Sequence, residues 1–110
     1  MLIYKICNQA DWDAAVRDDT YVGSAKDRAD GFLHFSKGEQ LAETLRLHYS
    51  GASDLVLIAV EADELGDALK WKTSRNSELF PHLYSGLPAA LVKWTAPITR
   101  DADGGFIVPL

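Results

Sequence analysis

The sequence of 110 residues has one cysteine, no long hydrophobic run and no cluster of basic residues. The single thiol, Cys7, excludes an internal disulfide framework and a four-thiolate zinc site, and it suits a reducing compartment. The longest apolar run, residues 55–60, is far shorter than the roughly 20 residues that cross a bilayer. The N-terminus also lacks the pattern of a signal peptide. We therefore expect a cytoplasmic protein without a membrane partner.

Positive charge is in short supply as well, because 11 Lys and Arg stand against 16 Asp and Glu, for a net charge of -5. Binding to a phosphate backbone requires a cationic surface, so DNA is not an expected partner. Hydrophobic residues make up 47% of the chain, which at this length is enough for one core but not for two. The composition predicts one domain over residues 1–110.

The functional prediction depends on the segment Asp-Gly-Phe-Leu-His-Phe-Ser at residues 30–36. In an extended chain, Phe32, His34 and Ser36 share one face, and both faces are largely apolar. Such a pattern is typical of an inner strand, so we expect His34 in partly dry surroundings. Its imidazole would then either transfer protons and bind a ligand, or be a structural ring that is hydrogen-bonded to backbone.

Ser36 is also predicted to begin a helix over residues 37–49. Ser36-Lys37-Gly38-Glu39 has the pattern of a capping box, in which the serine hydroxyl and the glutamate satisfy backbone amides at the helix start. This helix N-terminus would provide a phosphate site. His48 would lie at the inner edge of the last turn, either in the site or held there by the helix dipole.

A second histidine segment, Phe80-Pro81-His82-Leu83-Tyr84, repeats the aromatic, imidazole, hydroxyl order on one face. Pro81 donates no ladder hydrogen bond, which predicts a position at the edge of the sheet or just off it. We hypothesise that His34 and His82 meet across a cleft as acid and base. A metal site is not expected, because the three histidines are far apart in sequence and form no paired ligand motif.

The remaining pattern predicts an α+β fold with a split, mixed or antiparallel sheet and two main helices, because helices come early, strands come late and no βαβ rhythm occurs. Asn8 is a plausible N-cap for the first helix. Residues 21–23 read as a strand stub and residues 24–29 as a loop or helical turn, and this segment could lie over the site. The expected strands span residues 2–7, 55–61, 69–73, 91–98 and 106–108, the expected helices residues 10–17 and 37–49, and a polar loop residues 74–78.

Several of these segments together resemble the small bacterial domain-of-unknown-function 952 family. The resemblance is carried by residues 30–36, Gln40, His48, Leu55-Val56-Leu57, Leu69-Lys70-Trp71 and residues 80–84, and it spans nearly the whole chain. One departure is Lys72, which stands where that family usually has an acid.

That family is similar in fold to ADP-ribosyltransferases, especially the RNA 2'-phosphotransferase branch. The resemblance implies a cleft for a nicotinamide dinucleotide (NAD), with His34 at a ribose and Tyr49 or Tyr84 stacked on a ring. Two features differ from those enzymes. The first strand reads Tyr4-Lys5-Ile6-Cys7 instead of His or Arg followed by Gly and Thr or Ser, and residues 91–98 contain no late glutamate.

Three functions follow as hypotheses. The first is binding of a nucleotide or ADP-ribose-like small molecule, with a transferase reaction as an extension and NAD as a candidate cofactor. The second is a phosphoesterase with paired His-x-Ser/Thr motifs, although His82-Leu83-Tyr84 lacks the small hydroxyl. The third is a scaffold domain whose histidines are structural, and the oligomeric state stays open. The site residues of the first hypothesis are His34 and His82 as the catalytic pair and Ser36, His48, Tyr49, Trp71, Arg75 and Tyr84 as ligand contacts.

Overall fold

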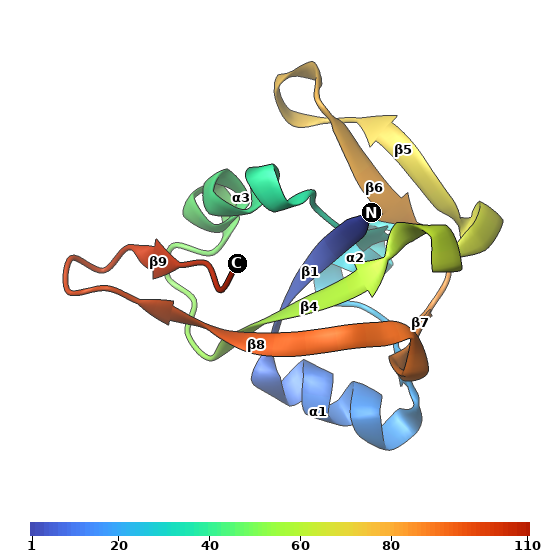
Figure 1. Ribbon diagram of the computed structural model, residues 1–110, viewed down its shortest axis with the longest axis horizontal. Coiled ribbons are helices and arrows are strands. Elements are labelled where there is room, and N and C mark those ends of the chain that lie inside the picture. Colours follow the sequence, from blue (N-terminus) through green and yellow to red (C-terminus); the bar gives the residue numbers. More distant parts are fainter.

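The computed structural model describes residues 1–110 and contains three antiparallel sheets and three α-helices (Figure 1). The largest sheet has the order β1-β4-β8-β9, a second has the order β3-β6-β5, and a third pairs β2 with β7. The α+β prediction is therefore confirmed. The strands are β1 (Leu2–Asn8), β2 (Thr20–Tyr21), β3 (Leu33–His34), β4 (Leu55–Glu61), β5 (Leu69–Thr73), β6 (Leu79–Leu83), β7 (Leu87–Pro88), β8 (Val92–Arg100) and β9 (Phe106–Ile107), and the helices are α1 (Gln9–Asp18), α2 (Ala25–Asp30) and α3 (Leu41–His48).

Strand β4 is the centre of the large sheet and supplies both hydrophobic cores. It lies between β1 and β8, so its first six residues are all buried. Alternate side chains point to opposite faces: Val56, Ile58 and Val60 pack into one core cluster, and Leu55 and Leu57 pack into the other. This explains why its sequence is apolar throughout, as predicted for residues 55–61.

The predictions for the early part of the chain concern the N-cap of α1 and the segment that follows this helix. The Asn8 side chain accepts a hydrogen bond from the Asp11 amide, as expected for the N-cap of α1. The strand stub predicted at residues 21–23 corresponds to the short strand β2, and the loop or helical turn predicted at residues 24–29 is helix α2. Ser24 and Asp27 form a capping box at the start of α2, because each side chain accepts a hydrogen bond from the other residue's amide, at 3.2 and 2.9 Å. None of the helices has the length and apolar character that crossing a membrane requires.

The predicted capping box at Ser36 is wrong. The Lys37 amide donates to Gln40 Oε1 at 2.9 Å, and one 3-10 turn, Gly38–Gln40, precedes α3. Ser36 instead continues the extended segment, since its amide donates to the Tyr4 carbonyl at 2.8 Å and its carbonyl accepts from the Tyr4 amide at 2.9 Å. These two bonds join the β3 segment to β1, so residues 33–36 connect the two larger sheets.

The edge position predicted for residues 80–84 is also wrong, because β6 is the middle strand of its sheet. Pro81 is tolerated there for a local reason. Its carbonyl accepts from the Phe35 amide at 3.0 Å, and the amide and carbonyl of one strand residue point to the same side. The Pro81 nitrogen, which has no hydrogen to donate, therefore faces Phe35, a residue that lies just beyond the end of β3.

Gly23, just before α2, is a position where only glycine fits. Its φ is +102°, and a Cβ built on it would lie 2.7 Å from both Asp27 Cβ and Leu33 Cδ2. We expect Gly23→Ala to lower the free energy of unfolding by more than about 2 kcal/mol, because left-handed strain and overpacking add. The matched control is Gly31→Ala, where φ is +84° and no atom lies within 4 Å. Urea denaturation would measure the free energy of unfolding of both variants. Equal decreases in the two variants would show that the close contacts of Gly23 add nothing to the cost of its positive φ.

Candidate functional site

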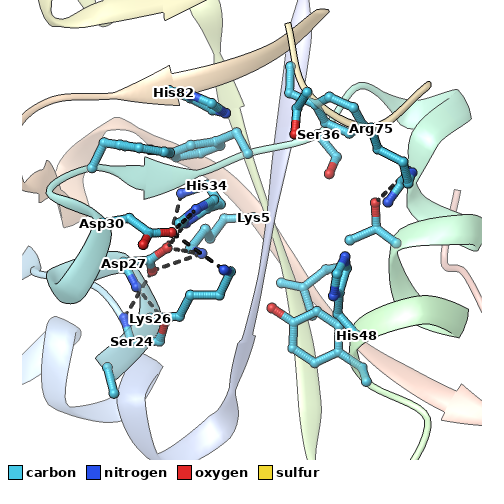
Figure 2. A pocket seen from close by; sticks show the side chains of 18 residues that line it. Lys5, Ser24, Lys26, Asp27, Asp30, His34, Ser36, His48, Arg75 and His82 are labelled. Carbon is cyan, nitrogen blue, oxygen red and sulfur yellow. Dashed lines mark hydrogen bonds and ion pairs between the residues drawn. The ribbon is translucent and has the colours of Figure 1, made fainter. Parts of the chain in front are cut away.

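A pocket of about 620 Å³ lies between α2 and α3, over β1 and the β3 segment (Figure 2). This volume is within the range of small-molecule sites. In Figure 2 the labelled side chains fall into two groups that face one another across the pocket, one around His34 and Asp27 and one around Arg75 and His48. The residues of both groups come from segments that are distant in the sequence, including Lys5, Asp27, His48, Arg75 and His82.

Asp27 is the anchor of the first group. Its carboxylate accepts from Lys5 Nζ at 2.9 Å, from His34 Nδ1 at 2.5 Å, from the His34 amide at 3.1 Å and from the Ser24 amide at 2.9 Å. The side chains of Asp27 and Lys5 are only 2% and 3% exposed. Burial by itself raises the pKa of Asp27, but the hydrogen bond from His34 and the Lys5 ammonium outweigh burial and hold this pKa well below its usual range. Asp27 is therefore a buried carboxylate that orients His34.

His34 is held between two carboxylates. Its Nδ1 contacts Asp27, and its Nε2 lies 2.9 Å from Asp30 Oδ2 at the end of α2. Both contacts are hydrogen bonds at the same time only when each ring nitrogen carries a proton. Lys26 Nζ lies 3.4 Å from the same Asp30 oxygen. The ring is therefore fixed in orientation, and its outer nitrogen is bonded to an exposed acid at the pocket.

His82 lies directly opposite His34 in the pairing of β3 with β6, and the two ring centroids are 5.8 Å apart. Phe32 stacks on the His82 ring at 4.1 Å and also contacts the His34 ring, at 4.4 Å. The His82 Nδ1 atom is buried without a hydrogen-bond partner. Burial, followed by the positive charges of His34 and Lys72, lowers the pKa of His82, while Asp30 acts in the opposite direction. His82 is thus an uncharged wall of the pocket near neutral pH.

Arg75 anchors the second group. Its Nη2 donates to Thr44 Oγ1 at 3.2 Å, and its guanidinium carbon lies 5.0 Å from the centroid of the Phe80 ring. The nearest carboxylate oxygen, on Glu43, is 3.8 Å from Nε, so the guanidinium is positioned without a close bidentate acid. Tyr49 lines the same side of the pocket, and burial together with nearby negative charge raises its pKa to about 12.

The structure brings six of the eight predicted site residues to this pocket: His34, Ser36, His48, Tyr49, Arg75 and His82. Trp71 does not belong to it. Trp71 pairs with Pro81 on the face of the sheet opposite to His82, and it is 36% exposed. Tyr84 lies outside the lining as well, and the centroid of its ring is 5.2 Å from that of the Phe32 ring.

Four charged residues of the site were not predicted: Lys5, Lys26, Asp27 and Asp30. Two signals were available. Ser24-x-x-Asp27 has the spacing of a capping box, and Lys5 interrupts an otherwise apolar strand. A lysine at such a position needs a buried acid. No group of three or more His, Cys, Asp and Glu side chains is arranged to hold a metal.

Comparison with known proteins gives a family and two solved structures. The family described as "Protein of unknown function (DUF952)" matches residues 6–95. The crystal structure of protein CC0527 from Caulobacter crescentus is 48% identical with a TM-score of 0.93, over 97% of this chain and 94% of that chain. The solution NMR structure of CC0527 is 50% identical with a TM-score of 0.84, over 94% and 90%. The curated proteins gave no match.

Replacing Asp27 tests the buried anchor. We expect Asp27→Asn to lower the free energy of unfolding by about 3 to 5 kcal/mol at neutral pH, because the Lys5 ammonium loses its counter-ion. The folded pKa of Asp27 lies below its ordinary value of 3.8, so its ionised form stabilises the protein above that value. This stabilisation is lost as the pH falls toward the folded pKa. Urea denaturation would measure the free energy of unfolding of both proteins. The difference between Asp27→Asn and the unchanged protein should be smaller at strongly acidic pH than at neutral pH.

The control for this comparison is Asp67→Asn, since Asp67 is exposed. It should change the free energy of unfolding by no more than about 0.5 kcal/mol. If Asp27→Asn lowered the free energy of unfolding as little as Asp67→Asn does, the stabilising role of the buried Asp27–Lys5 pair would be contradicted.

The pKa of His82 provides a second test. We expect it below the ordinary value of 6.5, because the ring is buried and positive groups lie near it. Lys72→Gln should raise this pKa while leaving it below 6.5, since burial remains. An NMR titration of the histidine rings would measure both values, with Lys93→Gln on β8 as the neutral control. A midpoint at or above 6.5 in the unchanged protein would disprove the buried placement.

Proposed function

The chain belongs to the DUF952 family, a family of unknown function, and we propose that its pocket binds a nucleotide-like ligand, with a phosphate at Arg75 and a sugar near His34. The observation that carries this proposal is that one pocket has, at each of two ends, a polar side chain held in a fixed orientation. His34 is held by the buried Asp27 at one end, and Arg75 is held by Thr44 at the other.

Charge supports an anionic ligand. The protein has a net charge of -5, but the pocket lining reverses this balance. Its lining includes three cationic side chains, Lys5, Lys26 and Arg75, and two acidic ones, Asp27 and Asp30. Lys5 and Asp27 neutralise one another at 2.9 Å. A local excess of positive charge in an acidic protein attracts anions to that site.

Arg75 is suited to a phosphate. A planar guanidinium offers paired N–H donors that match the geometry of phosphate oxygens. Thr44 and the Phe80 ring hold the side chain in place, which reduces the entropy lost on binding. His48 and Ser36 line the pocket beside it and add further hydrogen-bonding groups.

Flat and apolar side chains support a ring-containing ligand. Phe32, Phe80, Tyr49 and the stacked ring of His82 all line the pocket. Nucleobases stack on such surfaces, and polar groups at the ends of the pocket would fix their orientation. NAD and ADP-ribose belong to this ligand class. In a transferase reaction, His34 would be the proton-transfer group, because its orientation is set by Asp27 and its Nε2 contacts Asp30, another residue of the pocket lining.

A ligand titration followed by NMR would test the proposal. We expect AMP, ADP-ribose or NAD to cause saturable amide shifts at pocket residues of the full chain. Arg75→Ala should weaken AMP binding at least about tenfold, because a charge-assisted hydrogen bond is lost, while the weaker binding of adenosine should not change. Arg17→Ala on the exposed side of α1 is the control. Absence of saturable shifts with all three phosphate ligands would refute the proposal.

A further inference from the structure

We propose that the Asp30 carboxylate stands in the place of an acidic ligand oxygen at His34 Nε2, so that the ligand carries a second acidic group that displaces Asp30. This inference rests on the proposed function, and it narrows the ligand class. The ligand would be a nucleoside bisphosphate or a molecule of similar charge distribution, with one anionic group for Arg75 and a second one, carried by the sugar near His34, for His34 Nε2. Asp30 would then be the residue that determines specificity at this end of the pocket.

The first support is the charge balance around His34. Asp27 is shared between His34 and Lys5, and Lys5 is buried beside it at 2.9 Å. The Lys5 ammonium therefore already neutralises the Asp27 carboxylate. When both His34 nitrogens carry protons, the counter-ion of the ring is Asp30, at 2.9 Å from Nε2. In that protonation state a group that replaces Asp30 must itself be negative, because a neutral hydroxyl would leave the imidazolium without a counter-ion.

The second support is the difference between the two carboxylates. The Asp27 side chain is 2% exposed and is held by four hydrogen bonds from three residues. The Asp30 side chain is 39% exposed, and its ion pairs are with His34 and Lys26 only. Asp27 therefore belongs to the fixed structure, whereas Asp30 can rotate away with little loss of packing. Figure 2 shows Asp30 beside His34, and both residues line the pocket.

The third support is the position of Asp30 on its helix. It is the last residue of α2, where the partial negative charge of the helix end disfavours a carboxylate. Lys26, one turn earlier on the same helix, lies 3.4 Å from Asp30. Because Lys26 is itself exposed, it would remain a partner for Asp30 after the carboxylate leaves His34. The displaced acid thus keeps a favourable contact outside the ligand's position.

Adenosine 3',5'-bisphosphate and AMP, titrated against the full chain by NMR or calorimetry, distinguish this inference from simple nucleotide binding. We expect Asp30→Asn to bind the bisphosphate about tenfold more tightly than the unchanged protein, because the competing charge is removed. AMP affinity should change less than about twofold, since its phosphate is held at the Arg75 end. Asp30→Ala should follow Asp30→Asn, and the exposed Asp67→Asn should have no effect.

Two outcomes would overturn the inference. Weaker bisphosphate binding in both Asp30 variants would make Asp30 a direct ligand contact, and an unchanged affinity would show that it does not compete. In both cases AMP binding, together with its loss in Arg75→Ala, would leave the proposed function standing. If neither AMP nor the bisphosphate shifts the pocket residues of any variant, the proposed function fails and the inference fails with it.

Discussion

The buried contact of Asp27 with Lys5 and His34 is the constraint on which this structure depends. It joins β1, α2 and β3, three elements that are separated in the chain, through distances of 2.9 and 2.5 Å. A lysine and an aspartate that are both almost fully buried are stable only as partners, because either charge alone would be strongly disfavoured in the core. The same contact that closes the fold also fixes the orientation of His34.

The pocket follows from how the two larger sheets meet. The backbone bonds between Tyr4 and Ser36 join the β3 segment to β1, and β6 then places His82 opposite His34. Helices α2 and α3 flank the opening and supply charged and hydrogen-bonding groups. The short contact between the β3 segment and β1 thereby leaves a concave surface between rigid elements. Ligand sites commonly form at such surfaces.

The sequence patterns predicted the structure correctly where interactions between neighbouring residues decide it. The apolar strand over residues 55–61 and the Asn8 cap both formed as predicted. Predictions failed where a distant partner decides. Ser36 pairs with Tyr4 instead of capping a helix, β6 is central despite Pro81 because β3 ends beside it, and Trp71 is on the opposite face from His82. Asp27 was overlooked because its partner Lys5 is 22 residues away.

The sequence by itself determined the α+β class, the buried central strand and the histidine segments, because hydrophobic periodicity and capping act over a few residues. It also carried the family resemblance through residues 30–36 and 80–84. Only the tertiary structure decided which charges meet. Whether Asp27 neutralises Lys5, and whether Asp30 reaches His34, depends on the register of strands and the placement of α2. Such long-range contacts leave no periodic signal in a single chain.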